Sequence, residues 1–76
     1  MNKKRRTTLN EADGILAQAL SIIEGVLSEE QDCLDNLNTN FEETDLYKAI
    51  EKAVDALADA IEKIKEAQES LQEAVS

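Results

Sequence analysis

The stretch that decides the fold is "DLYKAIEKAVDALADAIEKIKEAQESLQEAV", residues 45–75. Its apolar residues return at steps of three and four, which is the spacing of one face of an α-helix. The stretch contains no proline or glycine to interrupt a helix. The pattern therefore predicts one helix from about 45 to 75, roughly 45 Å long. We expect its seam to combine one aliphatic column with one alanine column: Ile50, Leu57, Ile64 and Leu71; Ala53, Ala60, Ala67 and Ala74.

The first half of the chain carries a second seven-residue repeat. Thr8 and Glu11 have the spacing of a capping box, which predicts a helix from about 8 to 35. Within that seam Glu30 is the only charged residue, and Cys33 is interpreted as a small buried hydrophobe. The two expected columns are Leu9, Leu16, Ile23, Glu30 and Leu37; Ala12, Ala19, Val26 and Cys33.

The connection between the two helices is expected at about 36–44. Its asparagines and threonines favour turns because their side chains hydrogen-bond to the nearby backbone. Thr39 or Asn40 is the expected N-cap of the second helix, and Phe41 is expected to close that end of the molecule with Leu37. A short connection between neighbouring helices makes them antiparallel.

These patterns predict an all-α fold, an antiparallel two-helix hairpin that resembles a coiled coil with an alanine-rich seam. The hairpin domain is expected to span residues 8–76, after a basic N-terminal tail at residues 1–7. Folding back at about residue 40 would place Leu9 level with Leu71 and alanine level with alanine. Small residues at the same level allow two helices to approach closely.

One hairpin does not use all the apolar surface of the first helix. A core of 76 residues is marginal alone, and a stripe this wide exceeds what one neighbouring helix covers. We therefore expect a second copy to complete a four-helix bundle, with a dimer favoured; a different protein partner and a lone hairpin are the alternatives. The residues expected to self-associate are Ile15, Leu20, Ile22, Leu27 and Leu34.

Composition argues against catalysis, a metal site and a cofactor. The chain has one cysteine and no histidine, so it cannot form an internal disulfide or a tetrahedral zinc site. A two-helix hairpin offers no cleft in which a carboxylate would acquire a shifted pKa. No catalytic residue, metal ligand or cofactor is predicted.

The negative charge is concentrated outside the N-terminus. Residues 7–76 hold four bases against 17 acids, a formal charge of −13. Such a surface repels nucleic acid and attracts a protein with a basic surface. Acids on the outer side of the second helix form either a solvated face or an acidic rail that occupies a basic groove. The candidate partner-binding acids near the connection are Glu29, Glu30, Asp32, Asp35, Glu42 and Glu43.

The N-terminus is basic instead. Four consecutive bases are candidate phosphate contacts, although a solvated tail and a contact with the acidic connection of a second copy are alternatives. No apolar run reaches the length of a membrane span, and no apolar segment follows these bases as in a signal peptide. We expect a cytoplasmic protein without membrane contact. The bases are Lys3, Lys4, Arg5 and Arg6.

The segment 29–64, "EEQDCLDNLNTNFEETDLYKAIEKAVDALADAIEKI", resembles a family of small acidic helical proteins from Gram-positive bacteria and their phages. In that family a basic start leads into a leucine-rich helix, an acidic hinge and a second helix rich in glutamate and alanine. This chain departs from the family pattern at Asn38, where the family has proline, and at Phe41. The matching residues are Lys3 to Arg6, Glu29, Glu30, Asp35, Asn36, Leu37, Asn40, Glu43 and Tyr47.

The resemblance implies an origin in a mobile element and supplies no catalytic residues. By analogy with small acidic phage proteins, it suggests inhibition of a host factor in the host cytoplasm. The first hypothesis is thus a non-enzymatic protein-binding module, an inhibitor of a host defence or nucleic-acid-handling protein. A structural module that acts through oligomerisation is the second hypothesis, and nucleic-acid contact through the basic N-terminus is the third.

Overall fold

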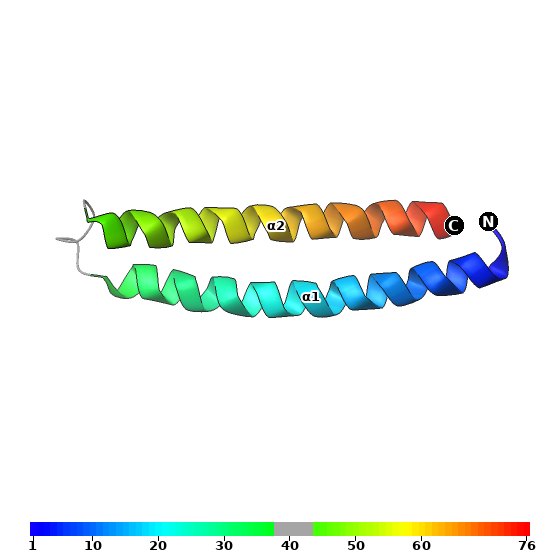
Figure 1. Ribbon diagram of the computed structural model, residues 1–76, viewed down its shortest axis with the longest axis horizontal. Helices are drawn as coiled ribbons and strands as arrows, with labels where there is room; N and C mark the ends of the chain where they lie inside the picture. The colour runs from blue at the N-terminus through cyan, green and yellow to red at the C-terminus, as the bar shows by residue number, and fades with distance from the viewer. Residues whose placement is uncertain (38–43) are drawn as a thin grey trace.

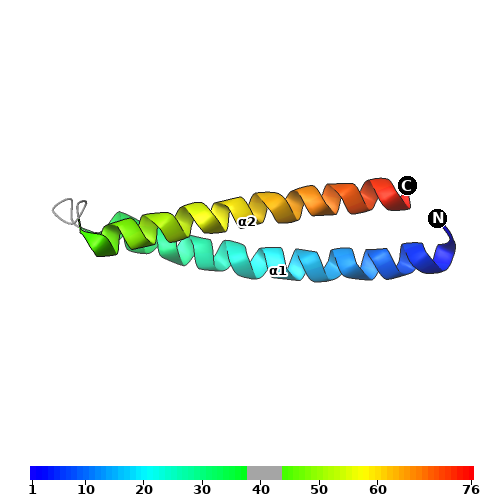
Figure 2. The ribbon, with the colours of Figure 1, turned by 45° about the horizontal axis from the view of Figure 1, so that its top comes forward.

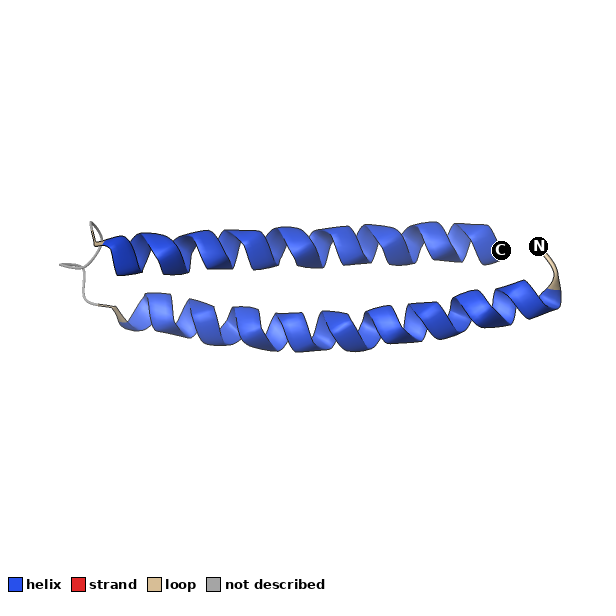
Figure 3. Ribbon diagram, in the orientation of Figure 1, coloured by secondary structure: helices blue, strands red, loops and turns tan. Residues whose placement is uncertain are grey.

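The chain forms two long helices joined by a short connection. In a computed structural model that describes residues 1–37 and 44–76, helix α1 spans Lys3–Asn36 and helix α2 spans Asp45–Val75. The helices lie side by side and antiparallel, with both chain ends at one end of the molecule (Figures 1 and 2). Helix is the only regular structure of the described residues (Figure 3). The predicted all-α hairpin is confirmed.

The hairpin is long and thin. It measures 58 × 15 × 14 Å, and its radius of gyration is 17.3 Å, whereas a compact domain of this length has about 11 Å. No described residue is fully buried, so the seam between α1 and α2 consists of half-buried side chains. No helix in the described ranges is long and apolar enough to cross a membrane.

Helix α1 begins five residues earlier than the capping box predicts. Asn2 is the N-cap, and its side-chain oxygen accepts a hydrogen bond of 2.8 Å from the backbone N–H of Arg5. Thr8 lies inside the helix, where its hydroxyl donates to the carbonyl of Lys4. Asparagine is among the strongest N-caps, and no helix breaker separates Asn2 from Thr8. The predicted basic tail is therefore wrong, because Lys3–Arg6 form the first turn of α1.

Helix α2 begins where the sequence predicts, but the residue that caps it differs. Thr44 is the N-cap, and its hydroxyl oxygen accepts a hydrogen bond of 3.2 Å from the backbone N–H of Tyr47. Asp45 follows in the first turn, where a negative charge suits the helix dipole. The predictions for Thr39, Asn40 and Phe41 lie outside the described residues.

The seam of α1 uses a different second column from the predicted one. The column that starts at Leu9 is half-buried as expected, including Glu30. In the predicted alanine column Ala12 and Ala19 are half-buried, but Val26 and Cys33 are exposed, Val26 at 42%. The residues one position later are half-buried and complete the seam: Asp13, Leu20, Leu27 and Leu34.

Helix α2 shows the same shift by one position. Its aliphatic column from Ile50 to Leu71 is half-buried as predicted. In its alanine column Ala53 and Ala60 are half-buried, but Ala67 and Ala74 are exposed. Larger side chains remove more apolar area from water than alanine does, and this difference orients the helix. The second seam column of α2 is Tyr47, Val54, Ile61, Gln68 and Val75.

The register between the helices also differs from the prediction. A fold-back at about residue 40 would put Asp13 level with residue 67, yet its carboxylate contacts the side chain of Gln72. Near the connection, Cys33 shares one shallow hollow with Ile50, and Leu37 shares it with Leu46. The paired numbers add up to 83–85 instead of 80, a shift of about one helical turn.

Candidate functional site

The predicted acidic site is distributed around the end of the hairpin. Glu29 and Asp32 are exposed and line a shallow hollow with Cys33, Leu46 and Ile50. Asp35 is exposed and accepts a hydrogen bond of 3.2 Å from the side chain of Gln31. Glu30 is half-buried in the seam. The structure thus brings two of the six predicted acids together, while Glu42 and Glu43 lie outside the described residues.

Cys33 has a different environment from the predicted one. The sequence pattern placed it in the apolar seam, but its thiol is free and exposed. The seam position at that level belongs to Leu34, whose larger side chain is half-buried. Cys33 lies on the surface and lines the hollow together with Glu29 and Asp32.

The residues predicted to self-associate divide into two groups. Leu20, Leu27 and Leu34 are half-buried in the hairpin's own seam, so the single chain already uses part of their surface. Ile15 and Ile22 remain 66% and 69% exposed. Only the second group therefore offers a large free apolar surface on α1.

Two opposite faces of the hairpin differ strongly in chemistry. We call the described residues that immediately precede a seam residue the apolar face, and those that immediately follow one the polar face. Of the 18 residues of the apolar face, only Glu29 and Lys63 are charged, whereas eight of the 17 on the polar face are charged. The exposed residues that characterise the apolar face are Ile15, Ile22, Val26 and Cys33 of α1, with Leu46, Ala49, Ala56 and Ala67 of α2.

Both helices contribute to the same apolar face. A step of one residue rotates by about 100° around a helix, so the residue before a seam residue lies on the same rotational side in α1 and α2. Two antiparallel helices are related by a twofold axis perpendicular to the plane that contains them. This axis leaves the two faces of the hairpin in place, so the residues that precede seam residues lie on the same face in α1 and α2. The hollow that contains Cys33 of α1 and Leu46 of α2 agrees with this geometry.

Helix α2 carries most of the acidic surface. Its acids step by three and four over the polar face and the outer edge, and all of them are exposed. Among them Asp59 forms an ion pair of 2.8 Å with Lys63, one turn further. The hydrogen bond and charge of Asp59 raise the pKa of Lys63. We call the following set the acidic rail: Glu51, Asp55, Asp59, Glu62, Glu66, Glu69 and Glu73.

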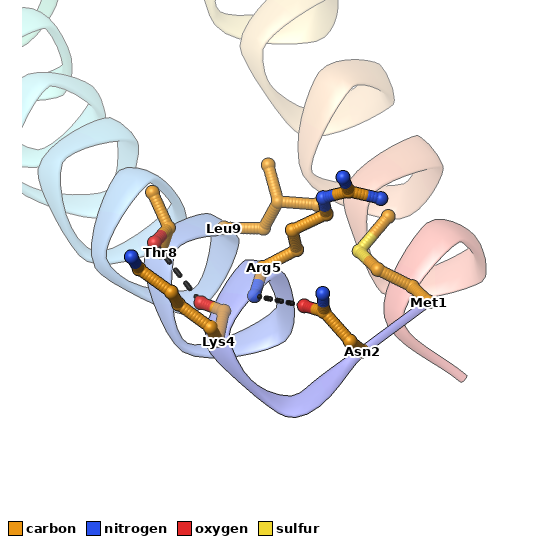
Figure 4. Close-up of a pocket in the computed structure, with 6 residues that line it drawn as sticks. All are labelled: Met1, Asn2, Lys4, Arg5, Thr8 and Leu9. Atoms are coloured by element: carbon orange, nitrogen blue, oxygen red, sulfur yellow. Dashed lines mark hydrogen bonds between the residues drawn. The ribbon is translucent and has the colours of Figure 1, made fainter.

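The basic N-terminus does not form one patch. Because Lys3 to Arg6 lie within a helical turn, their side chains are distributed around the axis. A hollow near the chain ends is lined by Lys4 and Arg5 but not by the other two bases. Lys4 and Arg5 point away from each other in Figure 4. Lys4 and Arg5 thus do not converge on one phosphate, whereas Lys3 and Arg6 are one turn apart on the same side of α1. Phosphate contact stays a prediction.

Asp13 was missed by the sequence analysis. One of its carboxylate oxygens accepts a hydrogen bond of 3.4 Å from Gln72, while the other is shielded from water and has no hydrogen-bond partner. It stands in the seam column that continues with Leu20, Leu27 and Leu34. That seven-residue spacing was the signal that could have identified it.

The described residues form no grouping suited to metal chemistry. No three histidine, cysteine, aspartate or glutamate side chains in residues 1–37 and 44–76 gather closely enough to hold an ion. The candidate surface is thus a pair of faces and not a cavity, and the absence of catalysis stays a prediction.

Comparison with known proteins found no matching family model, no similar curated protein and no similar solved structure.

Proposed function

We propose that this chain is a non-enzymatic protein-binding module that engages a partner with a basic surface. The observation that carries the proposal is the acidic rail, which covers the outer side of α2 with exposed carboxylates. Residues 51 and 73 at its ends lie about 33 Å apart along the helix axis. A row of negative charge on a rigid rod complements a basic groove, and long-range attraction accelerates such encounters.

The class of partner follows from the charge. A groove that is basic over this length is typical of proteins that hold nucleic acid. Together with the family resemblance, this supports a role as a phage or mobile-element inhibitor of a host defence or nucleic-acid-handling protein. Such an inhibitor would act in the host cytoplasm.

Self-association is the second part of the proposal. The apolar face supports a homo-oligomer, with a dimer favoured, because exposed apolar patches of this kind mark interaction sites. An assembly module that functions only through this contact is the alternative function, and it predicts no dependence on the acids.

A charge-reversal experiment tests the acidic contact. The tagged chain is presented to the phosphocellulose-binding proteins of a bacterial lysate, and bound proteins are quantified at low and high salt. A triple variant, Asp55→Lys, Glu62→Lys and Glu69→Lys, is compared with a second triple at the connection, Glu29→Lys, Glu30→Lys and Asp32→Lys. Both change the charge by the same amount, and circular dichroism checks that each remains helical.

We expect binding that weakens at high salt and is lost in the first triple variant, because both changes remove attraction between exposed charges. Loss only in the second triple would move the contact to the connection. Binding that survives both triples and high salt would contradict an acidic contact surface.

A further inference from the structure

The elongated single chain leaves more surface in water than a compact chain of this size exposes. The single chain exposes 5689 Å², whereas a compact monomer of its mass exposes about 4,600 Å². The excess, about 1,100 Å², is comparable with the roughly 800 Å² that each partner buries in a stable interface. One interface of ordinary size would therefore give the chain a normal exposed area.

The size of the side chains differs between the two halves of this face. Helix α1 contributes Ile15, Ile22 and Val26, which are 66%, 69% and 42% exposed. Helix α2 contributes six alanines, among them Ala56, Ala60 and Ala67, and has Leu46, 57% exposed, at its start near the connection. One half therefore projects and the other half is recessed.

We propose that a second copy covers the apolar face, with α1 of each copy lying on α2 of the other and both connections at the same end. The arrangement gives the self-association proposed above a specific face and geometry. A twofold axis parallel to the helices generates it, and the result is a four-helix bundle in which every neighbouring pair is antiparallel.

In this arrangement the register of the hairpin places large side chains of α1 in one copy at the level of alanines of α2 in the other copy. Residues whose numbers add up to about 83 lie level within one chain, and the twofold axis preserves those levels between chains. Ile15 of one copy then lies at the level of Ala67 of the other, and Ile22 at the level of Ala60. Val26 lies at the level of Ala56. Each projecting side chain meets a recess, which is how packed helices interdigitate.

The reverse arrangement, with connections at opposite ends, fits less well. It would place α1 on α1 and α2 on α2, so that isoleucine meets isoleucine on one side and alanine meets alanine on the other. Helix separation depends on the side chains at the contact and varies between about 8 and 10 Å. Two flat hairpins cannot satisfy a wide and a narrow separation together without leaving a gap.

A pair of adjacent substitutions tests the face. Ile22→Glu places a charge on the apolar face, and Ser21→Glu places the same charge one residue earlier on the polar face, where Ser21 is exposed. We expect light scattering to give twice the chain mass for the wild type and Ser21→Glu, and one chain mass for Ile22→Glu. A single-chain mass for the wild type at all micromolar concentrations would overturn the whole proposal of self-association.

Disulfide cross-linking tests the arrangement without destabilising substitutions. Two chains with Cys33→Ser, one carrying Ile22→Cys and the other Ala60→Cys, are mixed and oxidised, with a tag to distinguish their sizes. The proposed arrangement predicts a mixed disulfide between them. The control pair on the polar face, Ser21→Cys mixed with Ala58→Cys, should stay uncross-linked because its Cα atoms are more than 7 Å apart.

The outcomes separate the geometry from self-association itself. A dimer that instead cross-links Ile15→Cys to Ile22→Cys has its connections at opposite ends, which overturns the arrangement but keeps the dimer. A dimer that is lost equally in Ser21→Glu and Ile22→Glu does not use the apolar face. A wild-type monomer that binds a basic protein through the rail would keep the acidic contact and overturn the second-copy proposal.

Discussion

The apolar face and the polar face of the hairpin are built from the same two helices. The apolar-face residues precede the seam residues and the polar-face residues follow them, so corresponding residues are two positions apart in the chain. The apolar face carries two charged residues in 18, and the polar face carries eight in 17. Most residues of both faces are exposed, so contact between the two helices does not by itself require either composition. The difference supports the two proposed contacts: an apolar contact with a second copy and a charged contact that remains in water.

The thin seam of the hairpin makes a second apolar contact favourable. Half-buried seam residues give limited stability, since burial free energy follows the apolar area removed from water. Covering the apolar face would bury both the face and the edges of the seam. Folding and pairing would then be linked, while the polar face keeps its exposed carboxylates for another protein.

The largest expected effect distinguishes the seam from the apolar face at two neighbouring residues. Leu27 is half-buried in the seam, and Val26 is 42% exposed beside it. We expect Leu27→Ala to lower the free energy of unfolding by about 2–3 kcal/mol, and Val26→Ala to lower it by about 1 kcal/mol. Urea unfolding at one fixed protein concentration measures both. A larger loss for Val26→Ala than for Leu27→Ala would show that the predicted column with Val26 and Cys33 forms the seam.

A second pair of substitutions compares the faces on α2. Ala56 and Ala58 are both exposed, the first on the apolar face and the second on the polar face. Leucine and alanine have similar helix propensity, so the two changes differ mainly in location. Ala56→Leu should fill the recess that receives Val26 of the other copy. We expect it to make the free energy of dimer formation less favourable by about 1–3 kcal/mol. That corresponds to a rise of roughly 5-fold to 140-fold in the dimer dissociation constant.

Ala58→Leu should leave the dissociation constant unchanged. Sedimentation equilibrium of both variants gives the comparison directly. A tighter dimer for Ala56→Leu would show that the recess is absent, and that the faces meet without the proposed interdigitation.

A third prediction concerns the polar residue within the seam. One carboxylate oxygen of Asp13 is shielded from water without a hydrogen bond, whereas Gln72, the hydrogen-bond donor to the other oxygen, is exposed. Asp13→Leu would continue the leucine column and should raise the free energy of unfolding by about 1–2 kcal/mol. Glu11→Leu, an exposed position two residues earlier, is the matched control and should change it by less than about 0.5 kcal/mol. No gain from Asp13→Leu would indicate that this end of the seam is open to water.

The smallest effect is expected outside the apolar face. A Cβ atom built at Gly14 or Gly25 meets nothing within 4 Å, and glycine costs roughly 1 kcal/mol against alanine inside a helix. Gly14→Ala and Gly25→Ala should each raise the free energy of unfolding by about that amount without changing the dimer mass. If either variant lost the dimer, the second copy would contact the side of α1 that carries the glycines, and the proposed use of the apolar face would be wrong.

The parts of the fold that sequence predicted well depend on strong local patterns. Helix α2 starts and ends where its unbroken periodicity indicates, and Glu30 occupies the charged seam position that was expected. Local sequence could not show whether Val26 or Leu27 belongs to the seam, because both columns repeat every seven residues. The column that faces the other helix is determined by the apolar area that is buried against it.

The predicted start of α1 and the predicted register between the helices were wrong for different reasons. Asn2 and Thr8 are both acceptable caps, and the choice of Asn2 requires that four bases enter a first turn whose dipole disfavours them. The register depends on the conformation of the connection, which short-range patterns do not specify. A shift of about one turn moved Asp13 beside Gln72 and changed which side chains lie level, so the seam partners could not be derived from the repeat alone.

The most direct test of the proposed dimer is the solution mass of the wild-type chain by light scattering, measured with helix content across micromolar concentrations. We expect twice the chain mass of 8.4 kDa, with helix content that falls as dilution separates the copies. A mass of one chain at every concentration, with helix content unchanged, would contradict it. The thin seam would then be sufficient by itself, and the apolar face would have no second copy to cover it.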